Sequence, residues 1–278
     1  MYTLGIDIGS TTSKCVILKD GEYVYAKGLA VGGLGTQGPE IALNTIWNES
    51  GLTKSDIART IVTGYGRNRF EGGDGEVSEL TCHALGGRFV FEDLRTVIDI
   101  GGQDAKVITL SESGKMSNFV MNDKCAAGTG RFLDVMAGIL CVDINDFERY
   151  AQKSENPASI SSTCTVFAES EVISQLANGV EMPDLIAGIC DSVATRVGSL
   201  ARRAGVRETV CMSGGVARNG AVRKAMEKVL GVKIEFDPLA QYFGAIGAAL
   251  YAHRQITRQT ICSESDREKQ KQIFNKED

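Results

Sequence analysis

The 278-residue sequence has no long apolar run and no excess of positive charge. No stretch approaches the roughly 18 consecutive apolar residues of a membrane-spanning helix, and Met1 leads into an alternating strand instead of a basic segment followed by an apolar block. The formal net charge of −5 excludes the broad positive surface that nucleic acid or anionic lipid requires. We therefore expect a cytoplasmic protein with no nucleic-acid partner and no membrane partner.

The sequence also lacks cysteines paired as CxxC. Its eight cysteines are spread from Cys15 to Cys262, which argues against a secreted disulfide framework. We interpret four that stand in apolar runs as buried structural thiols, namely Cys15, Cys141, Cys190 and Cys211. Cys82 stands next to His83, a pair that could suggest a nucleophile and its base. Adjacent side chains rarely face each other in the geometry that this needs, so we interpret both as core or surface bystanders.

The sequence does contain the same strand pattern twice. Residues 4–8 alternate between apolar and other side chains and predict a strand, and a return strand follows a turn. The pattern recurs as strands at 96–100 and 105–110. Each unit carries Asp-Ile-Gly at the end of its first strand, roughly 90 residues apart, which indicates an internally duplicated, two-lobed α/β protein.

Helical spacing of apolar residues completes the outline. It predicts helices at about 39–50, 130–139, 166–178, 184–204 and 244–251. We assign residues 1–95 plus 244–260 to the first lobe and 96–243 to the second lobe, which contains most of the cysteines. The polar segment 261–278 is expected to be a solvated helix or a disordered tail.

Three glycine-rich turns have the composition of phosphate-binding loops, because only small residues let backbone amides approach a phosphate. They lie at 7–14, 99–104 and 212–217. Together and in this order they resemble the two phosphate motifs and the adenosine motif of the superfamily that contains actin, the heat-shock chaperones and sugar kinases. The resemblance implies an α/β fold with duplicated mixed β-sheets flanked by helices, and nucleotide in the cleft between two lobes.

The same resemblance gives individual residues roles. Asp7 would position Mg2+ through water, with help from Asp99, and Gln103 and Asp104 are candidates for orienting the attacking water. An alternative for Asp104 is that it only caps its turn. The residues expected to bind ATP or ADP are Ser10, Thr11, Thr12, Ser13, Lys14, Gly101, Gly102, Gln103, Gly214, Gly215, Asn219 and Gln241.

Two competing nucleotide signatures fail on inspection. Residues 33–38 match GxGxxG, but the strand at 61–63 ends without the acidic residue that would hold a ribose, so we interpret them as a flexible loop. Residues 215–220 have the glycine spacing of a P-loop, yet Ala221 stands where the phosphate-binding lysine is needed. Neither segment predicts a second nucleotide site.

Cys125 and Cys164 differ from the other cysteines, because each lies in a small polar turn just ahead of a predicted helix. A helix N-terminus lowers a thiol pKa and favours the thiolate that ligates iron. A cubane cluster needs four thiolates and one chain offers two, so such a cluster would require two chains. From spacing alone, the alternative of two structural thiols stays open.

The residues around these cysteines carry a closer resemblance. The segments 125–132, 164–171 and 101–106 resemble those of the ATP-dependent activators of 2-hydroxyacyl-CoA dehydratases, relatives of the benzoyl-CoA reductase ATPase subunits, and the likeness extends over residues 1 to about 253. It implies an oxygen-sensitive homodimeric ATPase of anaerobic amino-acid fermentation in which Cys125 and Cys164 of both subunits bind one 4Fe–4S cluster. Ferredoxin or flavodoxin would donate an electron, which ATP hydrolysis drives onto the dehydratase.

Two other functions stay open at this stage. One is a small-molecule kinase, for a sugar or an acid, with Asp104 as general base; the other is an actin-like filament ATPase. The sequence does not reveal which 2-hydroxyacyl-CoA the partner would use, because the activator never needs to touch that substrate.

Overall fold

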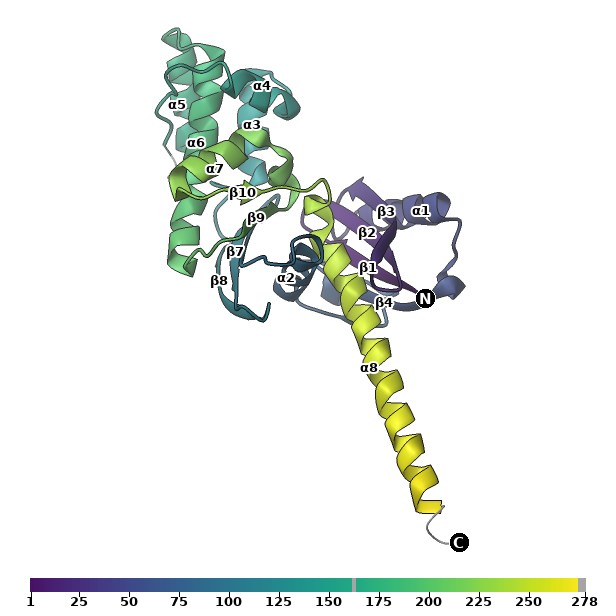
Figure 1. Ribbon diagram of the computed structural model, residues 1–278. Helices are drawn as coiled ribbons and strands as arrows, with labels where there is room; N and C mark the ends of the chain where they lie inside the picture. Colours follow the sequence, from purple (N-terminus) through teal and green to yellow (C-terminus); the bar gives the residue numbers. More distant parts are fainter. Residues whose placement is uncertain (162–163, 275–278) are drawn as a thin grey trace.

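The computed structural model describes residues 1–161 and 164–274, which form two five-stranded mixed sheets flanked by helices (Figure 1). The first sheet has the strand order β3-β2-β1-β4-β5. Its strands are β1 (Tyr2–Ile8), β2 (Thr12–Lys19), β3 (Tyr23–Val31), β4 (Ile57–Thr63) and β5 (Gly75–Glu76). The second sheet has the order β10-β9-β6-β7-β8. Its strands are β6 (Thr96–Ile100), β7 (Ala105–Leu110), β8 (Met116–Asn122), β9 (Val210–Ser213) and β10 (Ile234–Glu235).

The two sheets repeat one another strand by strand. In the first, β1 pairs antiparallel with β2 and parallel with β4; in the second, β6 pairs antiparallel with β7 and parallel with β9. The hairpin registers also agree, since Asp7 lies opposite Lys14 and Asp99 opposite Lys106. The predicted duplicated mixed sheets are confirmed.

Helices cover the sheets and connect them. α1 (Gly38–Ser50) packs on β3 and β2, whereas α2 (Glu79–Val90) and α8 (Phe243–Phe274) pack on each other beside β1. The remaining helices belong to the second sheet and are α3 (Gly130–Leu140), α4 (Phe147–Ala151), α5 (Thr165–Ala177), α6 (Met182–Ala204) and α7 (Gly220–Leu230). Glycine permits the close approach of α2 and α8, because a Cβ on Gly86 or Gly247 would overlap the backbone of the other helix.

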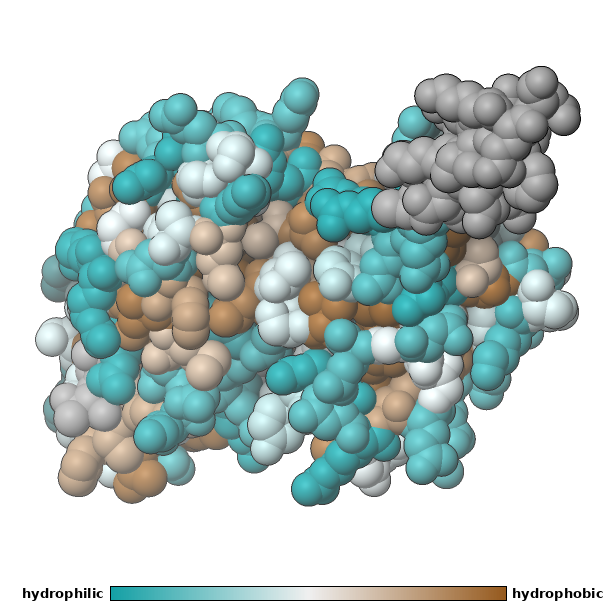
Figure 2. Space-filling model, turned by 90° about the horizontal axis from the view of Figure 1, so that it is seen from below, coloured by the Kyte–Doolittle hydropathy of each residue, from teal (hydrophilic) through white to brown (hydrophobic). Residues whose placement is uncertain are grey.

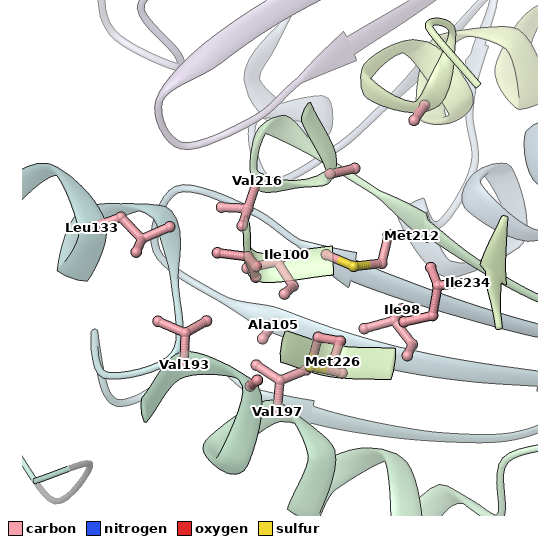
Figure 3. Packing of buried hydrophobic residues seen from close by; sticks show 14 of the residues in the cluster. Ile98, Ile100, Ala105, Leu133, Val193, Val197, Met212, Val216, Met226 and Ile234 are labelled. Carbon is pink, nitrogen blue, oxygen red and sulfur yellow. The ribbon is translucent and has the colours of Figure 1, made fainter. Parts of the chain in front are cut away.

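The largest hydrophobic core lies around the second sheet. Figure 3 shows side chains of α6 and α7 lying against the strands. The labelled members include Val193, Val197 and Met226 from the helices and Ile98, Ile100 and Ala105 from the sheet. A second core joins β1–β4 to α1. On the face shown in Figure 2, hydrophobic residues appear mainly in recesses between hydrophilic ones.

Most predicted elements agree with the structure. The helix predicted at 244–251 continues as α8 to Phe274 and projects from the body (Figure 1), so residues 261–274 follow the helical alternative given for the tail. Within the expected tail, residues 275–278 lie outside the described residues. α2 and β8 were not predicted at all. Among the residues that the structure describes, no helix is long and apolar enough to cross a membrane.

Candidate functional site

The three glycine-rich turns meet in one cleft of about 840 Å3 between the sheets. Nearly all the residues expected to contact nucleotide lie on its wall: Asp7, Ser10, Thr11, Thr12, Lys14, Gly101, Gly102, Gln103, Asp104, Gly214, Gly215, Asn219 and Gln241. Ser13 does not, because its buried hydroxyl donates to the Gly32 carbonyl at 2.8 Å. The structure therefore brings together side chains that are more than 200 residues apart in the sequence.

Glycine is required where the turns approach one another. A Cβ on Gly102 would overlap the Thr11 hydroxyl, so the two hairpin turns touch across the cleft. Gly214 has φ +83°, and a Cβ there would collide with the Ile100 carbonyl. These positions leave backbone atoms exposed to the cleft, as a phosphate-binding wall requires.

Each hairpin places a buried aspartate beside a lysine. In the first, Lys14 Nζ lies 3.1 Å from Asp7 Oδ2, and both side chains are nearly buried. In the second, Lys106 Nζ lies 3.3 Å from Asp99 Oδ2. The duplicated hairpins thus direct two carboxylates and two ammonium groups toward the same cleft, a charge set suited to phosphates and a divalent cation.

The second pair has additional partners. Lys106 Nζ also lies 2.7 Å from Asp104 Oδ2 and 3.6 Å from Glu79 Oε1. Burial alone would lower the pKa of Lys106, but the three surrounding carboxylates outweigh it and hold the pKa well above its ordinary range. Burial likewise works to raise the pKa of Asp99, yet His83 and Lys106 outweigh it and hold the pKa well below its usual range. Lys106 and Asp99 are therefore both charged at neutral pH.

His83 is a functional candidate that the sequence reasoning missed. It lies on the cleft wall, with Nδ1 3.0 Å from Ser213 Oγ and 3.4 Å from Asp99 Oδ1. Ser213 donates its hydroxyl hydrogen to Asp99 at 2.7 Å, so its oxygen accepts from His83 Nδ1–H. The partners of His83 come from β6 and β9 and not from its neighbour Cys82, so the two adjacent residues do not form a nucleophile–base pair.

Replacing Lys106 with methionine is expected to lower the free energy of unfolding by about 3–5 kcal/mol, because it leaves three buried or half-buried carboxylates without their shared cation. Lys14→Met, which removes a cation facing one carboxylate, should cost less. Urea unfolding measures both losses, and equal losses in the two variants would contradict this assignment.

The stability should also depend on pH. The stabilisation from the low pKa of Asp99 is present above pH ~4 and is lost as the pH falls toward that lowered pKa.

The two predicted iron ligands lie outside the cleft in different settings. Cys164 is the N-cap residue of α5 and is half-buried, as expected. Cys125 is also half-buried, but Thr129 and not Cys125 is the N-cap of α3. The expectation that both thiols lie at a helix N-terminus was therefore wrong for Cys125, since the chain makes a further turn at Gly128, with φ +87°, before the helix begins.

Of the other described cysteines, four are buried and therefore poor ligands, and the fifth corrects a prediction. Burial raises the thiol pKa of Cys82 and Cys190 to about 12, and it raises the pKa of Cys15 and Cys211 further. Cys141, predicted to be buried, is exposed at the left-handed C-cap of α3.

In the described part of the chain, no three His, Cys, Asp or Glu side chains gather as a metal site. The donors nevertheless fit a shared cluster, because Cys125 and Cys164 are free, partly exposed thiols and Cys164 is the N-cap residue of α5. Ser162 and Thr163 of that turn lie outside the described residues.

Comparisons with known proteins give consistent matches. The model of the BadF/BadG/BcrA/BcrD ATPase family matches residues 4–252. The (R)-2-hydroxyglutaryl-CoA dehydratase activating ATPase of Acidaminococcus fermentans is 56% identical over 93% of this chain and 99% of its own. The activator of lactoyl-CoA dehydratase of Anaerotignum propionicum is 51% identical over 91% of this chain and 98% of its own.

Solved structures agree with these relatives. The activator of the 2-hydroxyisocaproyl-CoA dehydratase from Clostridium difficile, with bound ADPNP, superimposes with a TM-score of 0.91 at 51% identity, covering 94% of this chain and 97% of its own. A glucokinase of the ROK family from Streptomyces griseus shares only the fold, with a TM-score of 0.53 at 13% identity, covering 91% of this chain and 100% of its own.

Proposed function

This chain belongs to the BadF/BadG/BcrA/BcrD ATPase family, and from that premise we propose that it activates a 2-hydroxyacyl-CoA dehydratase by ATP-dependent delivery of single electrons. The observation that carries the proposal is its identity above 50%, over nearly full length, with ATPases named as activators of such enzymes. Those relatives are named for dehydratases of different substrates, so the proposal specifies the class of partner enzyme and not its hydroxyacyl-CoA substrate.

The cleft supplies what ATP hydrolysis needs. Asp7 and Asp99 would hold Mg2+, which would neutralise charge on the phosphates, and Lys14 and the surrounding turn amides would bind the phosphates. Gln103 is exposed on the cleft wall, so its amide is available to orient the attacking water. Asp104 is engaged by Lys106 at 2.7 Å, which favours a positioning role over that of a free general base.

The loss of a free base at Asp104 also weakens the kinase alternative. A sugar or acid kinase needs a carboxylate that is free to accept the proton of the acceptor hydroxyl, and this one is held by Lys106 at 2.7 Å. The likeness to a sugar kinase at 13% identity concerns the fold alone.

The cysteines define the electron-transfer part of the proposal. Cys125 and Cys164 of two copies would hold one 4Fe–4S cluster, which when bound takes one electron from ferredoxin or flavodoxin and passes it to the dehydratase. The N-terminal amides of α5, next to Cys164, stabilise negative charge at this position. Lobe rotation with nucleotide state would change how these amides face the centre.

A homodimer is supported by the surface of α5. Its exposed apolar side chains are Val166, Phe167, Ile173 and Leu176. Val166 and Phe167 stand two and three residues after Cys164, the residue that would meet its symmetry mate at a shared cluster. Contact between two copies at this helix would therefore bury the apolar surface and bring the four thiols together.

Phe167→Asp should convert the dimer into a monomer, because it places a charge on this apolar surface. Sedimentation of the anaerobic protein measures the change. Tyr23→Asp is the matched control, since Tyr23 on β3 is equally exposed, at 65%, but lies on the first sheet. A dimer that persists in the Phe167 variant would remove α5 from the interface.

The proposal as a whole is tested by anaerobic purification and mixing with a 2-hydroxyacyl-CoA dehydratase and reduced ferredoxin. We expect a brown dimer with about four irons per two chains, and dehydratase activity that appears only with hydrolysable ATP. A colourless, oxygen-indifferent monomer that phosphorylates a small molecule would instead establish the kinase, and ATP-dependent light scattering without iron would establish a filament protein.

A further inference from the structure

Helix α3, which follows the Cys125 turn, begins directly on the second phosphate loop. The Gly130 amide donates to the Gly101 carbonyl at 2.8 Å, and the Arg131 amide donates to the Gly102 carbonyl at 2.9 Å. Gly101 and Gly102 both line the cleft. Two amides at a helix start, which are usually satisfied by a cap or by water, are here satisfied by the loop expected to contact the terminal phosphate.

The Cys125 turn is joined tightly to that helix start. The Thr129 hydroxyl donates to the Ala126 carbonyl at 2.7 Å, and on the other side Asn122 Nδ2 donates to the Cys125 carbonyl at 3.0 Å. Asp123, two residues before Cys125, is itself on the cleft wall. A short hydrogen-bonded unit thus extends from the phosphate loop to the first cysteine.

The Cys164 turn is held by other elements. The Ser161 amide donates to the Glu171 carboxylate of α5, and Gln175 Nε2 donates to the Ser159 carbonyl at 2.8 Å. Ser192 Oγ of α6 donates to the Ser161 carbonyl at 3.5 Å. Of the described residues of this turn and its anchors, none lines the cleft.

We infer that nucleotide controls the two cysteines unequally. Binding of a terminal phosphate repositions or orders the Gly101–Gly102 loop, and the α3 amides transmit the change to Cys125 within the second half of the molecule. Cys164 stays fixed to α5 and α6. The inference rests on the proposed function, in which both cysteines hold one centre: nucleotide then alters one ligand pair of that centre relative to the other, in addition to any rotation of the lobes.

The link can be cut at one atom. Arg131→Pro removes the amide hydrogen that binds the Gly102 carbonyl, and a Gly-Pro start is tolerated in this protein because α1 begins with Gly38–Pro39. Arg131→Ala is the matched control, since it removes the same exposed side chain and keeps the amide. Both full-length variants are compared with the unaltered protein by hydrogen-exchange mass spectrometry, with and without a non-hydrolysable ATP analogue.

In the unaltered protein and in Arg131→Ala, we expect the analogue to slow exchange at 123–129 by roughly fivefold, the value of one hydrogen bond, and to leave 158–161 unchanged. Arg131→Pro should abolish the response at 123–129. Equal responses at both cysteine turns, no response at either, or the same response in both variants would overturn the inference. If Arg131→Pro fails to fold or to bind the analogue, Thr129→Val decides: it removes the hydroxyl that donates to the Ala126 carbonyl between α3 and Cys125, so the response should not reach 123–126, and its persistence there counts against the link.

These outcomes are separate from those of the proposed function. Hydrogen exchange reports on the backbone whether or not iron is bound, whereas iron content and dehydratase activation report on the cluster. A brown, active protein with equal exchange responses would retain the proposed function and lose this inference.

Discussion

Cys164→Ser is expected to yield a folded protein without iron that cannot activate a dehydratase, and Cys125→Ser is expected to do the same. Each substitution removes two of the four thiolates from a centre shared by two copies, and two thiolates do not hold a cubane cluster. Binding of ATP should persist, because neither cysteine lies on the cleft wall. Iron and sulfide analysis, the visible spectrum and nucleotide binding measure these three results on one anaerobic preparation.

The matched control for this experiment is Cys141→Ser. Cys141 is an exposed thiol at the end of α3, so it tests whether loss of any accessible cysteine disturbs the protein. It should keep its iron and its activity. Retention of a full complement of iron in the Cys125 or Cys164 variant would eliminate the shared-cluster model.

Asp7→Asn is expected to lower the rate of ATP hydrolysis by about 10²–10³-fold, the effect of removing one well-placed electrostatic group from a reaction centre. Asp7 is 3% exposed, faces the cleft, and carries the negative charge that balances Lys14. Asparagine has the same shape and keeps a hydrogen bond to Lys14, so the fold should survive while the hold on magnesium is lost. Steady-state hydrolysis at saturating ATP measures the rate.

Asp134→Asn controls for loss of one negative charge from the same wall. Asp134 lines the cleft from α3 but is exposed and does not belong to either Asp–Lys hairpin. Hydrolysis by this variant should stay within about twofold of the unaltered rate, as is usual for exposed positions. Comparable losses in both variants would show that overall charge matters and that Asp7 has no special position.

Sequence reasoning succeeded where the signal is local. Strand alternation and the glycine turns fixed both hairpins, and the helix predicted at 39–50 is observed at 38–50. The three turns could be assigned to one cleft only by resemblance, because residues 7 and 214 are brought together by sheet topology and not by spacing.

The errors had different physical causes. His83 could not be recognised without α2, whose weak periodicity hides a helix that packs against α8 and the second sheet. Lys106 was overlooked although a signal existed: in the duplicated hairpins both lysines stand seven residues after an aspartate, so the Asp7–Lys14 pair predicts the Asp99–Lys106 pair. Cys141 was judged from its apolar neighbours, but a left-handed C-cap turned it to solvent.

The length of α8 has a mechanical consequence. The helix starts at the cleft floor, where a Cβ on Gly244 would lie 2.7 Å from Asp7 Oδ2, and it continues for 32 residues. At 1.5 Å per residue it is a rod roughly 48 Å long, anchored at one end by α2 and β1. Tilting the anchored end by about ten degrees would move the free end by roughly 8 Å. A small rotation of the helix at the cleft would therefore become a large displacement at its far end.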